Sequence, residues 1–239
     1  MRLSKVFVAT LAILGILTSA ASRAQPLSST QLTYQIKLDS SRFGNAALGE
    51  IQTTLTREAD SYRVESTTIA QGMAAILVGN FQESCEFRLQ DGRALSQSYR
   101  GGRPEQDEYA VEFDWSAKKI HFKGSEPLDM PQGYVIDNCN MPFAMAVLNE
   151  RDTADTVYVV DGKKTRIRGY RIRAKSREIV ATKIGKLDTL KMVLEREYEP
   201  QKTVTLWLSR AHQFLPIKME ERRKSRTTTM MLTSLQVDT

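Results

Sequence analysis

The segments Glu83-Ser-Cys-Glu-Phe87 and Ile136-Asp-Asn-Cys-Asn-Met-Pro-Phe-Ala-Met-Ala-Val-Leu148 contain the two cysteines of this 239-residue chain. Cys85 lies where apolar and polar residues alternate, as in a half-buried strand, whereas Cys139 comes just before an apolar run. A disulfide between them would hold a strand and a short apolar helix together within a chain that otherwise has the pattern of strands. The alternative is a pair of buried free thiols.

The first residues have the features of a signal peptide. Arg2 and Lys5 precede an apolar run at 6–17, and Ser22-Arg23-Ala24 is a small-x-small cleavage site. The run is shorter than the ~20 residues that a membrane-spanning helix needs. We therefore predict a signal peptide at 1–24, export to the periplasm and no membrane-spanning segment. Because exported proteins keep disulfides, we favour a Cys85–Cys139 bond over free thiols.

The net charge of the exported form is smaller than the composition of the whole chain indicates. The full sequence has a formal net charge of +6. Arg2, Lys5 and Arg23 leave with the signal peptide and no acid leaves, so the charge falls by three, to +3. This modest excess gives no support to nucleic-acid binding. Residues 25–239 have the length of a single β-rich domain.

Alternating apolar and polar residues recur along most of this domain. Segments at 31–38, 47–56 and 62–69 have this pattern, and Asp91-Gly92 is a hairpin signal between two more strands. About a dozen strands follow one another without helices of the kind that connect parallel strands. We predict an all-β fold in which a curved antiparallel sheet forms a barrel, half-barrel or sandwich.

Two short apolar helices interrupt the strands in this prediction, one near 71–78 and one from Met141 to about Asn149, with Asn140 as its N-cap. Their side chains either fill the core or form a lid over an apolar cavity that holds a lipid-like ligand. The candidate ligand or lid residues are Met73, Ile76, Leu77, Met141, Phe143, Met145 and Leu148.

A basic run at 163–177 is the second candidate site. Its cations alternate along a predicted strand, with one change of phase at Gly169-Tyr170 that suits a β-bulge and would keep them on one face. Such a row either contacts an anionic partner, such as lipid head groups or an acidic polymer, or forms a solvated face paired with Glu195, Glu197 and Glu199. The candidate residues are Arg166, Arg168, Arg171 and Arg173.

Signatures of catalysis and of cofactors are missing from the sequence. His121 and His212 are far apart, no C-x-x-C motif is present, and no nucleophile elbow or phosphate-binding loop occurs. Asp114, Asp137 and Glu83 could pair in space as glycosidase carboxylates do, but their spacing favours no particular pair. We therefore predict a protein without catalytic, cofactor-binding or metal-binding residues.

Several short motifs together resemble those of the bacterial exported family DUF3108, over nearly all of the exported chain. They are Tyr34-x-Ile, Gly49-Glu-Ile, Tyr62-Arg-Val-Glu-Ser66, Phe81-x-Glu-Ser84, Phe113-Asp114, Trp207-Leu-Ser209 and Leu215-Pro-Ile217. The family usually has Asp-Gly-Arg after the Trp-Leu-Ser motif, where this chain has Arg210-Ala-His-Gln213. The resemblance implies an uncharacterised exported domain and carries over no site residues. Its architecture is similar to that of periplasmic lipoprotein carriers, by analogy of fold.

Two hypotheses of function follow. The first is a non-enzymatic periplasmic carrier whose curved sheet encloses an apolar or lipid-like envelope ligand. The second is a structural module that docks on an envelope protein complex or an anionic polymer. A hydrolase has the least support in the sequence.

Overall fold

The computed structural model describes residues 26–41, 44–72, 75, 79–103, 106–148 and 156–238. The predicted signal peptide at 1–24 lies outside the described residues. The same is true of Met73, Ile76 and Leu77 of the first predicted helix. Within the described part of the chain, no helix is long and apolar enough to cross a membrane.

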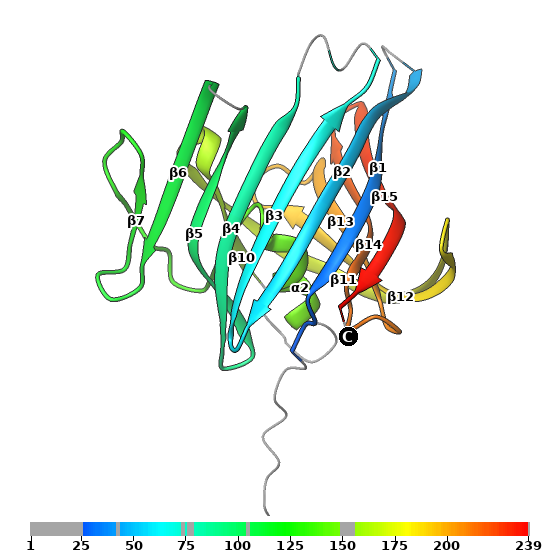
Figure 1. The fold of residues 1–239 in the computed structure, drawn as a ribbon. Coiled ribbons are helices and arrows are strands. Elements are labelled where there is room, and N and C mark those ends of the chain that lie inside the picture. The colour runs from blue at the N-terminus through cyan, green and yellow to red at the C-terminus, as the bar shows by residue number, and fades with distance from the viewer. Residues whose placement is uncertain are drawn as a thin grey trace, which may run out of the picture.

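Most of the described residues belong to a single sheet (Figure 1). Its strands are β1 (Thr30–Ser40), β2 (Gly44–Glu58), β3 (Ser61–Ala70), β4 (Phe81–Gln90), β5 (Arg93–Arg103), β6 (Gln106–Asp114), β7 (Lys119–Phe122), β8 (Leu128–Asp129), β9 (Tyr134–Asp137), β10 (Thr156–Asp161), β11 (Arg166–Thr182), β12 (Gly185–Arg196), β13 (Lys202–Ser209), β14 (Pro216–Arg223) and β15 (Arg226–Val237). The described helices are α2 (Met141–Leu148) and the 3₁₀ turn η1 (Gly162–Lys164).

The order of strands in the sheet places the middle of the chain at both edges. From β8 the order runs down to β1, then from β15 down to β9, so that the first strand pairs with the last. The edge strands β8 and β9 are consecutive in sequence, yet no ladder joins them, and the sheet is not closed. The predicted all-β fold with a curved sheet is thus confirmed as one large open sheet.

One pair of strands departs from the predicted antiparallel arrangement. β9 and β10 run parallel, with Val157 opposite Tyr134 and Val159 opposite Ile136. Parallel neighbours need a crossover connection, and α2 lies in the segment that connects them. The second predicted helix is therefore present, and it has a topological role that the sequence pattern did not indicate.

The interior of the fold lies between two halves of the sheet, β1–β8 and β9–β15. Figure 1 shows α2 between strands β2–β5 in front and strands of the second half behind. The helix contacts β5 and β9 as well as β14. Apart from half-buried Pro142, its residues are all buried. A helix that is apolar all round is stable only inside a core, so the burial of α2 follows from its sequence.

The two halves are also joined by contacts other than strand pairing. The predicted disulfide between Cys85 of β4 and Cys139, just before α2, is confirmed, with a Cα–Cα distance of 6.1 Å. Nearby, the backbone N–H of Ala94 donates to the hydroxyl of Tyr134 at 3.1 Å. These contacts attach β9 and the start of α2 to the inner side of β4 and β5.

Candidate functional site

A cavity of about 330 Å³ lies on the inner side of the sheet, bordered by residues of both halves. Its lining residues come from β4, β5, β6, β10, β11, β13 and β14, together with η1 and the start of α2. They are Phe81, Glu83, Tyr99, Tyr109, Asn138, Met141, Asp161, Lys163, Lys164, Arg168, Tyr170, Val204, Met219, Glu221 and Arg223. We call this space the inner cavity.

One side of the inner cavity is apolar. Phe81, Met141, Tyr170, Val204 and Met219 contribute to its lining. Strand alternation explains the direction of Val204 and Met219, because they share the inward face with the buried core residues of β13 and β14. Apolar side chains at the wall of a cavity suit contact with the hydrocarbon part of a ligand.

The opposite side contains a buried carboxyl group with two phenols. The hydroxyl of Tyr99 donates to Oε1 of Glu83 at 2.6 Å, and that of Tyr109 donates to the same oxygen at 3.0 Å. The two hydroxyls are 2.7 Å apart. Burial raises the pKa of the Glu83 carboxyl against the opposing effect of these hydrogen bonds, and burial also raises the pKa of both phenols. The group therefore favours its neutral, protonated forms.

Two glycines make the contact between Tyr109 and Glu83 feasible. Gly101 of β5 lies in register between Glu83 and Tyr109, and a Cβ atom there would fall 2.3 Å from the Tyr109 hydroxyl oxygen. A Cβ at Gly162 would fall 2.6 Å from Cδ2 of the same ring. The ring therefore lies between β5 of one half and η1 of the other. Without side chains at these two positions, it reaches across β5 to the carboxyl group on β4.

A buried ion pair forms the next part of the cavity wall. Arg168 of β11 is 8% exposed and Asp161 of β10 is 7% exposed. Nη2 of Arg168 donates to Oδ2 of Asp161 at 2.6 Å, and Nε of Arg166 lies 3.4 Å from the same oxygen. Nε of Arg168 is also buried, but it has no acceptor among the described residues. We call Glu83, Tyr99, Tyr109, Asp161 and Arg168 the cavity cluster.

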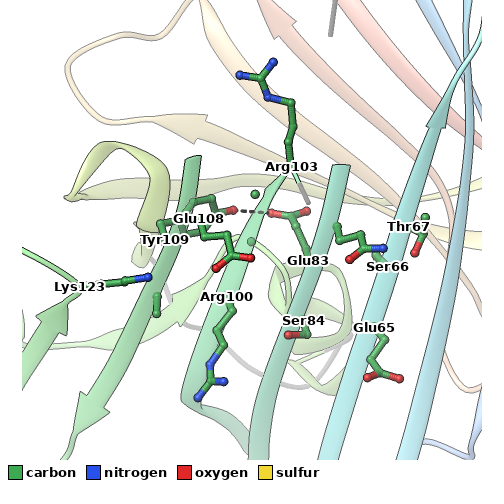
Figure 2. Close-up of a pocket in the computed structure, with 14 residues that line it drawn as sticks. Glu65, Ser66, Thr67, Glu83, Ser84, Arg100, Arg103, Glu108, Tyr109 and Lys123 are labelled. Atoms are coloured by element: carbon green, nitrogen blue, oxygen red, sulfur yellow. Dashed lines mark hydrogen bonds between the residues drawn. The ribbon is translucent and has the colours of Figure 1, made fainter. Parts of the chain in front are cut away.

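A second hollow, of about 610 Å³, shares Glu83 and Tyr109 with the inner cavity. Figure 2 shows the hydrogen bond between these two residues beside Arg103, with side chains of β3 to β6 around it. The lining is mostly polar and consists of Glu65, Ser66, Thr67, Gln82, Glu83, Ser84, Arg100, Gly101, Gly102, Arg103, Glu108, Tyr109, Ala110 and Lys123. The pair of Glu83 and Tyr109 thus separates two spaces.

A different polar cluster lies beside the disulfide. Asp137, Ser96 and Asn140 are each 0% exposed. Ser96 donates to Oδ2 of Asp137 at 2.7 Å, the backbone N–H of Asn140 donates to Oδ1 at 2.8 Å, and the Asn140 amide donates to Ser96 at 2.8 Å. Burial raises the pKa of Asp137 to about 7. We call these three residues the seam cluster, because they connect β5 to β9 and α2 where no strand ladder does.

The seam cluster also bears on metal binding. The carboxylate of Asp137 and the sulfurs of Cys85 and Cys139 lie within 4.8 Å of one another. Both sulfurs take part in the disulfide, so they are not thiolate ligands in this state. The expectation of a protein without a metal or cofactor therefore stays a prediction.

The predicted ligand or lid residues divide into three groups. Met73, Ile76 and Leu77 lie outside the described residues. Phe143, Met145 and Leu148 are 3%, 0% and 1% exposed and belong to the core around α2. Met141 is buried as well, but it lines the inner cavity. The lid role stays a prediction.

The four candidate arginines do not form one row, and the expected bulge at Gly169-Tyr170 was wrong. From Arg166 to Arg171, β11 pairs with β10 without a shift, and the register shift with β12 falls between Ile172 and Ala174. Regular alternation therefore turns Arg166 and Arg168 to one face and Arg171 to the other.

The outer arginines are paired with acids. Arg171 contacts Glu197 at 3.2 Å, and Arg173 contacts Glu195 at 2.7 Å. Both arginines are about half exposed, and these two acids belong to the set that the sequence indicated as partners of a solvated face. Arg168 is the member of the group that lines the inner cavity. Binding of an anionic partner by this strand stays a prediction.

The sequence did not predict the cavity cluster. Glu83 was one of three carboxylates that could pair, and the other two have separate partners. Asp137 belongs to the seam cluster, and Asp114 accepts from the Ser116 hydroxyl and the Ala117 N–H in a turn. One available signal was the phase of Glu83, an acid at the inward position two residues before Cys85. Asp161 and Arg168 gave no comparable signal, because their pairing depends on the register of β10 and β11.

Comparison with known proteins identifies the family. A family model described as "Protein of unknown function (DUF3108)" matches residues 33–233. The match covers most of the chain, so the chain belongs to this family, as its motifs predicted. No curated protein matches the sequence significantly.

One solved structure shows the same type of fold, and others align less well. A β-barrel-like protein of domain of unknown function DUF1849 from Brucella abortus is 10% identical, with a TM-score of 0.59, over 90% of this chain and 99% of that one. MucB gives a TM-score of 0.35 at 12% identity, over 92% of this chain and 56% of that one. A putative outer membrane lipoprotein-sorting protein domain from Vibrio parahaemolyticus gives 0.29 at 11% identity, over 91% and 88%. At these identities the first match indicates fold alone.

Proposed function

We propose that this member of the DUF3108 family is a non-enzymatic periplasmic binding protein that holds a small amphipathic, lipid-like envelope ligand in the inner cavity. The observation that carries the proposal is the make-up of the cavity wall. Apolar Phe81, Val204 and Met219 line the same space as the half-buried, hydrogen-bonded Glu83 and the buried Arg168. Small-molecule sites typically combine an apolar lining with a few convergent polar groups.

The energetics of burial support a role for the polar groups of the cavity cluster. Removing a carboxyl group or a guanidinium from water costs free energy unless partners replace the water. The cluster provides partners for most of its atoms, but Nε of Arg168 has none among the described residues. Groups kept in such surroundings at the wall of a cavity are typical of binding sites.

The volume of the cavity limits the ligand. Ligand pockets typically span about 300–1,000 Å³, and the inner cavity, at about 330 Å³, is near the lower end. We expect it to hold a polar head group and the adjoining carbons, and not an entire two-chain lipid. The core around Phe143 and Met145 is packed, so these residues would support the site without touching the ligand.

Binding fits the site better than catalysis does. A general base or nucleophile needs a form that ionises near the working pH. Burial raises the pKa of Tyr99 and of Tyr109, which disfavours their phenolate forms, and both hydroxyls already donate to Glu83. The disulfide supports an oxidising compartment such as the periplasm.

Native mass spectrometry tests the proposal, on protein purified from the periplasm after expression with its own N-terminal residues. We expect a bound small molecule that organic extraction releases. A Val204→Trp variant should lose it, because an indole at this inward position fills the inner cavity. Thr205→Trp is the matched control on the opposite face of β13, and it should keep the ligand. Wild-type protein that is repeatedly empty, and that binds no amphiphile when titrated, would overturn the proposal.

A second candidate is an interaction module, and an exposed apolar residue favours it. Ile179, in the long β11–β12 hairpin, is 72% exposed, and Ile184 at the tip of that hairpin is 38% exposed. Such side chains can dock on an envelope protein. Crosslinking in intact cells distinguishes the candidates, because an Ile179→Asp variant should lose a protein partner and keep a cavity ligand.

A further inference from the structure

Arg168, in the wall of the inner cavity, has one buried donor without an acceptor among the described residues. Its Nη2 donates to Asp161, while its buried Nε has no acceptor among the described residues. The side chain is 8% exposed and lines the inner cavity. A buried N–H without an acceptor costs free energy, so its persistence in a built wall indicates an acceptor supplied by a ligand.

Other cations surround the same space. Lys163 and Lys164 of η1 and Arg223 of β14 contribute to the lining. Arg223 donates through Nε to Glu221 at 2.6 Å. Lys163 lies 5.9 Å from the centre of the Phe81 ring, and neither lysine forms an ion pair within the described part of the chain. The positive groups therefore come from three separate elements, η1, β11 and β14.

The acids of the cavity do not cancel this charge. Asp161 is held by Arg168 and Arg166, and Glu221 by Arg223. Glu83 is half-buried and hydrogen-bonded to two phenols, and burial of its carboxyl group raises its pKa, which favours the neutral form. Lys163 and Lys164 are then left as an excess of positive charge at the cavity.

We infer that this part of the inner cavity is an anion site that receives a phosphate ester, with Nε of Arg168 as its buried donor. The inference rests on the proposed function and specifies the head group of its ligand. A planar carboxylate is best held by the two-pronged fork of an arginine. One nitrogen of the Arg168 fork, Nη2, is already engaged by Asp161, so Arg168 cannot offer both prongs to a ligand. Separate donors from three elements suit the tetrahedral oxygens of a phosphate.

Isothermal titration calorimetry with four soluble probes tests the inference. The probes are dihexanoyl phosphatidylglycerol below its micellar concentration, neutral dihexanoylglycerol, hexanoate and glycerol 3-phosphate. We expect the short phospholipid to bind most tightly. The Arg168→Gln variant should bind it at least tenfold more weakly, and its affinity for dihexanoylglycerol should fall by a smaller factor. Arg173→Gln is the matched control, since it removes an outer arginine of the same strand.

A second variant guards against misfolding. Arg168→Gln leaves Asp161 buried with one partner fewer, which destabilises the fold on its own account. The double variant Arg168→Gln/Asp161→Asn removes both charges and should fold, as circular dichroism and thermal unfolding will report. It should show the same loss of phospholipid binding.

The outcomes separate the anion site from the proposed function. Equal affinity of wild-type and Arg168→Gln protein for the phospholipid would overturn the anion site while the cavity remains a binding site. Hexanoate bound as tightly as the phospholipid would overturn the choice of phosphate. Binding of glycerol 3-phosphate alone, dependent on Arg168, would support the anion site and overturn an amphipathic ligand. Binding of none of the four would overturn both.

Discussion

The seam cluster and the cavity cluster are both buried polar groups on the inner side of one sheet, but they differ in how completely they are paired. In the seam cluster, the side-chain polar atoms of Ser96, Asp137 and Asn140 all have partners within 3.2 Å. In the cavity cluster, Glu83 and Asp161 are paired, while Nε of Arg168 is not paired within the described residues.

This difference indicates that the polar groups of the seam cluster have a structural role and that those of the cavity cluster have a functional one. A fully paired network rigidifies a single arrangement of the chain, and the seam cluster does this where strand pairing between the two halves is missing. A network that leaves a donor at the wall of a cavity retains binding capacity at some cost in stability. Perturbing the first should therefore change stability, and perturbing the second should change binding.

Removal of the disulfide should give the largest effect on the seam. A Cys85→Ser/Cys139→Ser variant frees a loop with a sequence separation of 54, which corresponds to about 4 kcal/mol in the chain-entropy model. Urea unfolding should show this loss relative to the oxidised wild-type protein. Wild-type protein in reductant is the control and should approach the variant. An unchanged unfolding midpoint would mean that the disulfide adds no stability to the seam.

The pH dependence of stability should report on Asp137. Burial raises its pKa to about 7 in the folded state, above the ordinary value of 3.8. The folded protein therefore binds the proton more tightly than the unfolded chain does. The resulting stability is fully present below about pH 4 and is lost as the pH rises through about 7, amounting to about 4 kcal/mol.

The Asp137→Asn variant isolates this contribution. It should lack the corresponding fall in stability, because an amide does not titrate. Urea unfolding of both proteins at pH 4, 5, 6 and 7 measures the difference between them. Parallel curves over this range would show that Asp137 is already ionised in the folded protein, and the assignment of the seam cluster as a neutral network would fail.

Paired deletions of a hydroxyl group compare the two clusters directly. Ser96→Ala removes a group that contacts both Asp137 and Asn140, and should cost about 2 kcal/mol because it leaves buried polar atoms without partners. Tyr109→Phe removes one of two donors to Glu83 beside a cavity that water can enter, and should cost about 0.5–1 kcal/mol. Chemical unfolding provides both values. Equal costs would remove the distinction between the clusters.

Much of the fold follows from local patterns in the sequence. The alternation at 31–38 corresponds to β1, Asp91-Gly92 is the turn between β4 and β5, and the apolar run after Asn140 is α2. The disulfide followed from compartment and from the presence of a single cysteine pair. These features depend on neighbouring residues or on elimination, so a single sequence is sufficient to predict them.

The candidate site depends on contacts between distant segments, and local patterns do not encode those. Tyr109 reaches Glu83 because Gly101 pairs with both and because Gly162 comes from the other half. Arg168 faces inward because β11 keeps its register past Gly169, whereas the sequence suggested a bulge there. The four arginines predicted to form one row therefore lie on two faces. Arg171 and Arg173 form outer ion pairs, Arg168 has a buried donor, and Arg166 lies beside Asp161 with Arg168.

The smallest effect is expected at those outer ion pairs. Arg173 is 51% exposed and contacts Glu195, which is 26% exposed, so solvent screens the attraction. Arg173→Gln should lower the free energy of unfolding by less than about 1 kcal/mol, as is usual for exposed pairs. Urea unfolding at low and at 0.5 M salt measures this loss of stability, and the small difference between variant and wild type should shrink further in salt.

Both faces of β11 carry arginines, and only Arg168 on the inner face should affect ligand binding. Arg173→Gln could instead lose as much phospholipid affinity as Arg168→Gln. That result would indicate that charge along the whole strand attracts the ligand. The contrast between the paired outer face and the unpaired inner donor would then no longer hold.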